Sequence, residues 1–169
     1  MKDQGFSLPE LLVTVAVLGI LASLGCISGR EHMARQQLEA ASRNLGQGIE
    51  QARTHAIRQN TPCGMGLTPD GWGATVSGAL PPCLPDGLPI QETGFGDGGL
   101  RIDHNMPAEL RFTSNGLVLD GGTVVLTIRG TALRRCLVMA LPLGVVRVGR
   151  YAGPPGSVLS VQCLPDPSL

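Results

Sequence analysis

Two hydrophobic patterns follow each other in the first third of the chain. Residues 11–29 contain no charged side chain, and as a helix rising about 1.5 Å per residue they reach roughly 28 Å, close to a bilayer core of about 30 Å. A secretory signal peptide fits poorly, because Lys2 stands beside Asp3 and no small-x-small cleavage site follows the run. The pattern therefore predicts a membrane-spanning helix over residues 6–29.

The second pattern is an apolar stripe with spacings of three and four residues, typical of an amphipathic helix. Its members are Leu38, Ala41, Leu45, Ile49, Ala52 and Ala56. We expect this half of the helix, residues 30–59, to pack on a sheet, with Gly46 and Gly48 allowing close approach and Pro62 ending the helix. One helix is thus predicted from about Phe6 to Gln59.

The remainder, residues 60–169, is predicted to be a β-rich globular domain. Residues 60–100 are rich in turn signals, with one possible short strand over 72–76. Later alternation predicts strands at 110–113, 117–119, 124–128, 133–141, 145–148 and 157–163. Ser114-Asn115-Gly116 is a hairpin signal between the first two. A long helix followed by an antiparallel sheet is an α+β fold.

The charge composition excludes two classes of protein. The 13 Lys and Arg balance 13 Asp and Glu, which excludes a uniformly basic nucleic-acid binder and an acidic disordered tail. The charges are nevertheless separated, since residues 61–100 hold four acids and no base, and residues 101–150 hold seven Arg and three acids. Arg134, Arg147 and Arg150 near neighbouring strand ends are candidate contacts for DNA phosphates. The alternative is that these arginines are solvated or paired with the acidic segment.

Enzyme and metal motifs are absent from the sequence. It has no Gly-x-Ser-x-Gly elbow, phosphate-binding glycine loop or HExxH motif, and His32, His55 and His104 are scattered singly. The five cysteines lack zinc-site spacing. We therefore predict no enzyme, no cofactor and no metal.

The cysteines instead indicate disulfides. Cys26 lies in the apolar run and is interpreted as a small hydrophobic residue. The other four allow three pairings. We favour Cys63–Cys83, which closes a local loop, and Cys136–Cys163, which ties the last segment to the sheet.

Glu10 interrupts the apolar stretch that begins at Phe6, and a carboxylate at membrane depth is costly without a partner. It either flanks the span at the interface or pairs with a cation from another chain.

The run Gly5-Phe-Ser-Leu-Pro-Glu-Leu-Leu-Val13 resembles the class III signal of type IV pilins and pseudopilins. That resemblance implies a leader of residues 1–5, cleavage between Gly5 and Phe6 by prepilin peptidase, methylation of Phe6, and an assembly role for Glu10. It departs from many pilins at Ile27, where they have a helix-bending proline.

The second half resembles the FimT/GspH group of minor pilins and minor pseudopilins. The resemblance rests on Arg-Phe-Thr-Ser-Asn-Gly at 111–116, a Cys-bearing strand, and Gly-x-x-Arg-x-Gly-Arg at 144–150. It implies a type IV pilin-like fold and the Cys136–Cys163 disulfide. It also implies a subunit that helps initiate or cap a type IV pilus or a type II secretion pseudopilus, with other pilins as partners.

The same resemblance implies a location and an alternative function. The chain is expected to lie first in the bacterial inner membrane, with a single pass and a periplasmic globular domain, and later at the tip of an extracellular pilus or a pseudopilus. The alternative is a FimT-like minor pilin that binds double-stranded DNA for uptake. The sequence leaves pilus and pseudopilus both open.

Overall fold

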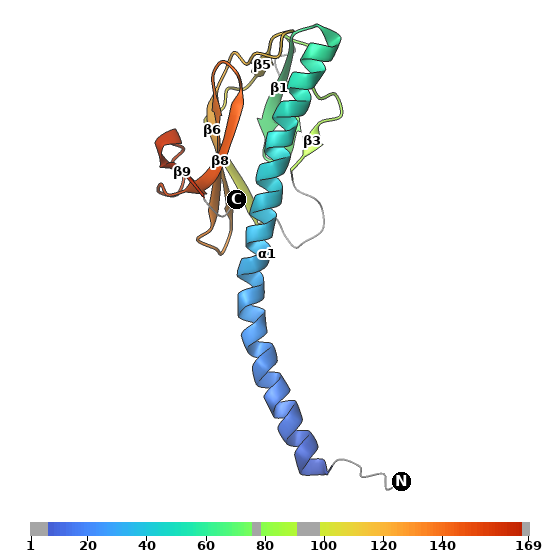
Figure 1. The fold of residues 1–169 in the computed structure, drawn as a ribbon, viewed down its shortest axis with the longest axis vertical. Helices are drawn as coiled ribbons and strands as arrows, with labels where there is room; N and C mark the ends of the chain where they lie inside the picture. Colours follow the sequence, from blue (N-terminus) through green and yellow to red (C-terminus); the bar gives the residue numbers. More distant parts are fainter. Residues whose placement is uncertain (1–6, 76–78, 91–98, 167–169) are drawn as a thin grey trace.

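The computed structural model describes residues 7–75, 79–90 and 99–166, and side chains 22–30 are not described. Its dominant element is α1 (Leu8–Gln59), a helix of 52 residues. Pro9 lies in the first turn, where a missing amide is tolerated, and Asn60 ends the helix in the left-handed conformation. In Figure 1, the first half of α1 stands clear of the body and the second half lies along it. The predicted end at Gln59 is confirmed, and α1 continues through Ile27.

Two antiparallel sheets pack with α1. The smaller sheet has the order β3 (Leu88–Pro89), β2 (Gly71–Gly73), β1 (Cys63–Thr68) and β5 (Leu110–Phe112). The larger sheet has the order β4 (Leu100–His104), β6 (Gly122–Ile128), β7 (Arg134–Ala140), β8 (Val145–Tyr151) and β9 (Cys163–Pro165). A short 3-10 helix, Ser160–Gln162, precedes β9. The predicted α+β fold, a long helix followed by antiparallel sheets, is confirmed.

Several strand predictions need correction. Residues 63–68, which lie in the segment expected to be rich in loops, form strand β1, in which Gly64 and Gly66 interrupt the apolar signal. The predicted strand 117–119 contributes only an isolated bridge between Val118 and Phe112. The predicted strand 157–163 is mainly loop and 3-10 helix, with β9 starting at Cys163. Likewise, β2 ends at Gly73 rather than at 76, which lies outside the described residues.

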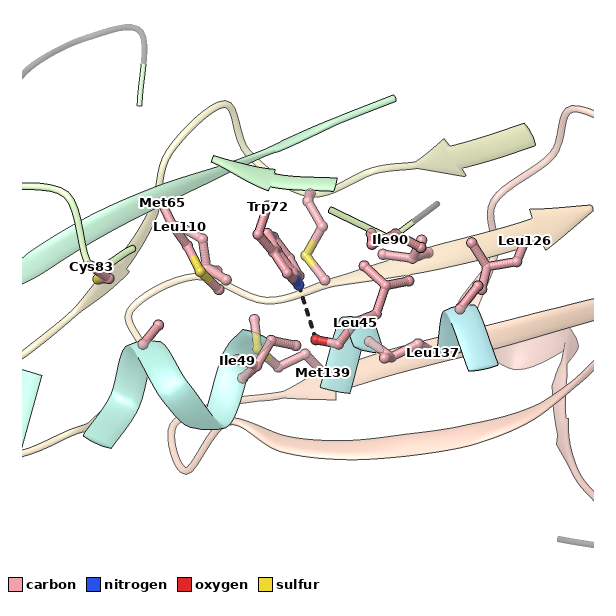
Figure 2. Close-up of a cluster of buried hydrophobic side chains, with 14 of the residues drawn as sticks. Leu45, Ile49, Met65, Trp72, Cys83, Ile90, Leu110, Leu126, Leu137 and Met139 are labelled. Atoms are coloured by element: carbon pink, nitrogen blue, oxygen red, sulfur yellow. Dashed lines mark hydrogen bonds between the residues drawn. The ribbon is translucent and has the colours of Figure 1, made fainter. Parts of the chain in front are cut away.

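The hydrophobic core lies between α1 and the inner faces of the sheets, and it uses the predicted helix stripe. All six stripe residues are at most 2% exposed. The other side of the core comes from alternate residues of the sheet strands, such as Leu126, Leu137 and Met139. Figure 2 shows these side chains in the same buried cluster as Trp72, which comes from β2.

Trp72 determines how closely the small sheet approaches α1. Its indole Nε1 donates a hydrogen bond of 3.0 Å to the carbonyl of Leu45, drawn as a dashed line in Figure 2. A Cβ added at Gly48 would lie 2.1 Å from Trp72 Cδ1. A Cβ at Gly46 would meet nothing within 4 Å. Close approach therefore requires glycine at position 48, and the same expectation for Gly46 is wrong.

The two helix glycines are predicted to respond oppositely to alanine. Gly48→Ala displaces the Trp72 ring and should destabilise the fold by about 1–3 kcal/mol, less the helix-propensity gain of up to about 1 kcal/mol. Gly46→Ala has the gain without the clash and should stabilise it. Urea unfolding followed by circular dichroism measures both. Equal responses would contradict the packing described for Gly48.

Candidate assembly site

The described side chains at the start of α1, residues 8–21, are apolar on every side of the helix apart from Glu10 and Thr14, and they are not covered by the body. The large exposed residues among them are Leu8, Leu11, Leu12, Val13, Val15, Val17, Leu18, Ile20 and Leu21, each at least 49% exposed. Such a helix is expected to be covered by lipid or by other helices, since a globular protein's surface helix keeps a polar face. Within the portion whose side chains are described, no helix is long and apolar enough to cross a membrane.

Glu10 lies at the start of this apolar half. Its side chain is exposed in the first turn of α1, and Ser7 Oγ donates a 3.4 Å hydrogen bond to Glu10 Oε2. A carboxylate in the first turn is favoured by the helix dipole. No ion pair joins Glu10 to another described residue. Gly5 and Phe6, the predicted processing residues, lie outside the described residues.

The three arginines proposed from sequence to contact DNA do not form one surface. Arg147 and Arg150 are both exposed on β8, but their separation of three residues places them on opposite faces of the sheet. Arg150 lies opposite Arg135 on the α1-facing side, whereas Arg147 lies opposite Val138 on the outer side. Arg134 is on the outer side but four residues along β7 from Val138, roughly 13 Å away. The expected shared patch on neighbouring strand ends is therefore wrong.

A buried arginine that sequence reasoning missed joins the helix to the sheet. The Arg135 side chain is 6% exposed, and its Nη2 donates to Glu39 Oε1 on α1 at 3.1 Å. Its Nη1 donates to Asp166, close to the C-terminal end. Arg135 alternates in step with the buried Leu137 and Met139, so it lies on the same face of β7. This spacing in the sequence could have indicated that Arg135 is buried.

A second ion pair, Arg111 with Asp120, is partly exposed. Arg111 donates from Nε to Asp120 Oδ2 at 2.8 Å and from Nη2 to Oδ1 at 2.9 Å. This hydrogen-bonded pairing holds the pKa of Asp120 below its ordinary value of 3.8 and raises the pKa of Arg111.

The Asp120 pairing predicts a pH-dependent stability difference. A carboxyl group whose pKa is lower in the folded state stabilises the fold at pH values above its ordinary pKa of 3.8. This contribution is lost as the pH falls below 3.8 and passes through the folded-state pKa. Asp120→Asn should therefore lower the thermal midpoint near neutral pH and have little effect in strong acid. Thermal unfolding followed by circular dichroism checks this, with the exposed Asp86→Asn as control. A difference that persists unchanged in strong acid would contradict it.

Two disulfides crosslink the body: one joins β1 to the segment between β2 and β3, and the other joins β7 to β9. Cys63 pairs with Cys83 at a Cα–Cα distance of 5.0 Å, and Cys136 pairs with Cys163 at 5.7 Å. These are the pairings favoured from the sequence. The second lies beside Val125 and Tyr151 on the outer face of the large sheet. It holds the C-terminal segment against that face.

Comparisons with known proteins identify the family of the chain. Residues 41–142 match the family described as type II transport protein GspH, and residues 1–25 match the prokaryotic N-terminal methylation motif. No curated protein matches the chain. The crystal structure of the type IV minor pilin FimU from Pseudomonas aeruginosa is similar with a TM-score of 0.48 and 20% identity, over 75% of this chain and 95% of that one. The family match spans more than half of the chain, so this protein is a type IV pilin-like minor pilin or pseudopilin of the GspH family.

Proposed function

We propose that this chain is a minor subunit that helps initiate or cap a type IV pilus or a type II secretion pseudopilus. The supporting observation is the uncovered apolar half of α1, which carries Glu10 in its first turn and continues directly into the body. In a bundle of such helices the apolar side chains would cover one another. The body would then be displayed on the outside of the bundle.

The proposed assembly step uses two charged groups at the start of the processed helix, the amine of Phe6 and the carboxylate of Glu10. Prepilin peptidase would cut between Gly5 and Phe6 and methylate the new Phe6 amine. The cation at Phe6 of one subunit could then neutralise the Glu10 carboxylate of a neighbour. Pairing a charge that is otherwise stranded among apolar helices would favour one axial register.

The proposed location changes during assembly. Before assembly, the apolar run of residues 11–29 would hold the chain in the bacterial inner membrane, with residues 60–169 in the periplasm. After assembly, the chain would lie at the tip of a pilus or pseudopilus among other pilins.

A deletion experiment tests the initiating or capping role. Cells lacking the chain should form far fewer filaments, and the remaining filaments should have the normal major-subunit composition. Electron microscopy counts the filaments, and re-expression of the wild-type chain is the control. An unchanged filament number would contradict this role.

A further inference from the structure

A basic pocket opens on the outer face of the large sheet, at the end where β4 and β7 begin and β6 ends. The cavity measures about 240 Å³ and is lined by Arg101, Arg129 and Arg134. We call these three arginines the outer basic pocket. Arg101 on β4 and Arg134 on β7 both pair with Thr127 on the central strand β6. Their Cα atoms are therefore two strand spacings, or roughly 10 Å, apart.

Positive charge predominates among the described residues that line this pocket. Arg101 binds Asp103, with Nη2 at 2.8 Å and Nε at 3.0 Å from Oδ1. Arg134 Nη1 donates to the carbonyl of Gly153 at 2.6 Å, which fixes its guanidinium at the pocket. Among the described residues, no carboxylate forms an ion pair with Arg129 or Arg134. Among the described residues that line the pocket, three arginines therefore share one carboxylate, that of Asp103.

The pocket is at the end of the body nearest the apolar half of α1. The Arg135–Glu39 contact aligns the start of β7 with Glu39. A Cβ at Gly116 would touch Ile57, and Val118 donates to the carbonyl of Pro142, so the far end of β7 lies toward the end of α1. The turn between β6 and β7 consequently points toward the N-terminal half of α1, in the direction of the lower end of the body in Figure 1.

Helix and strand geometry give the height, above the apolar run, of the β6–β7 turn that borders the pocket. Glu39 is ten residues beyond Gly29, or about 15 Å along the helix. The turn extends back from the start of β7 by two or three residues, roughly 7–10 Å. The tip of the turn, where Gly130 and Thr131 border the pocket, therefore lies about 5–8 Å above the end of the run, about the thickness of one headgroup layer, whereas Arg134 at the start of β7 lies about 15 Å above it.

We propose that the outer basic pocket binds the phosphate of an anionic phospholipid headgroup while the chain is anchored before assembly. The inference rests on the proposed membrane anchoring. Guanidinium groups bind phosphate oxygens through charge-assisted, often bidentate, hydrogen bonds, and cations close to an anionic membrane surface are attracted to it. The pocket would orient the body on the membrane, and the contact would be released when the subunit enters a filament.

The test compares the full-length chain with two double variants of equal charge change. Arg129→Gln/Arg134→Gln removes pocket cations, and Arg58→Gln/Arg147→Gln removes exposed cations nearer the opposite end. Each protein in neutral detergent is titrated with short-chain phosphatidylglycerol or phosphatidylcholine, and bound lipid is counted by native mass spectrometry. Wild type and control should prefer phosphatidylglycerol roughly tenfold, and the pocket variant should lose that preference. Arg129→Gln alone, expected to weaken the preference, serves if the double variant does not fold.

Three results would overturn the proposal. The first is that wild type shows no preference for phosphatidylglycerol, or that the pocket variants keep that preference. The second is displacement of phosphatidylglycerol by an equal concentration of inorganic phosphate, which would assign the pocket to free phosphate. The third is pocket-dependent binding of a short DNA duplex without any lipid preference.

A separate measurement distinguishes failure of the anchor. Carbonate extraction from pure phosphatidylcholine vesicles tests membrane insertion without anionic lipid. A chain that resists extraction but shows no phosphatidylglycerol preference overturns the pocket inference alone. A chain that is extracted overturns the proposed anchor, and with it the inference.

Discussion

Replacing Arg135 with alanine should reduce the free energy of unfolding by about 1.5–3 kcal/mol, because it removes charge-assisted hydrogen bonds to two partly buried carboxylates. Arg135 is 6% exposed and contacts both Glu39 of α1 and Asp166 near the C-terminus. The loss should therefore loosen the helix and the C-terminal segment together. Trp72, the only tryptophan, lies in the core, so its fluorescence during urea unfolding measures the change.

Arg150 provides the matched control for this experiment. It lies directly opposite Arg135 on the neighbouring strand, yet its side chain is exposed. Arg150→Ala should change stability by no more than about 0.5 kcal/mol. Similar losses in the two variants would contradict the role assigned to the buried ion pairs.

Replacing Glu10 with leucine should leave the chain in the membrane fraction and abolish its entry into filaments. The substitution makes the helix start more apolar, so membrane retention should not fall. It also removes the carboxylate proposed to pair with a neighbour's Phe6 amine. Quantitative immunoblotting of membrane and sheared-filament fractions measures the two effects separately.

Glu31→Leu is the control for Glu10, since it removes an exposed acid from the same helix beyond the apolar run. That variant should enter filaments as wild type does. Normal incorporation of Glu10→Leu, or equal exclusion of both variants, would contradict register pairing through Glu10.

Helical periodicity predicted the long element well, because the pattern repeats over many turns. The six stripe residues from Leu38 to Ala56 are all buried, and α1 ends at the predicted Gln59. Strands β6, β7 and β8 were also recognisable, since their apolar residues form uninterrupted or alternating runs. Strands β1 and β4 were missed because glycines in β1 and charged residues in β4 obscure the apolar signal.

The arginines show why sites on a sheet are hard to predict from sequence. Arg147 and Arg150 look like one cluster in the sequence, but the two-residue period of a strand sends them to opposite faces. Conversely, Arg101 and Arg134 are far apart in sequence and meet at one cavity only because β4 and β7 both pair with β6. Strand order, which local patterns do not encode, made the difference.

The N-terminal peptide of the chain recovered from sheared filaments gives the most direct test of the central claim. Mass spectrometry of that fraction should detect a peptide that begins at Phe6 and carries one methyl group. This result would show processing and assembly in the same molecule. Absence of the chain from the filaments while it is abundant in the membrane, or its presence there with residues 1–5 still attached, would contradict the account.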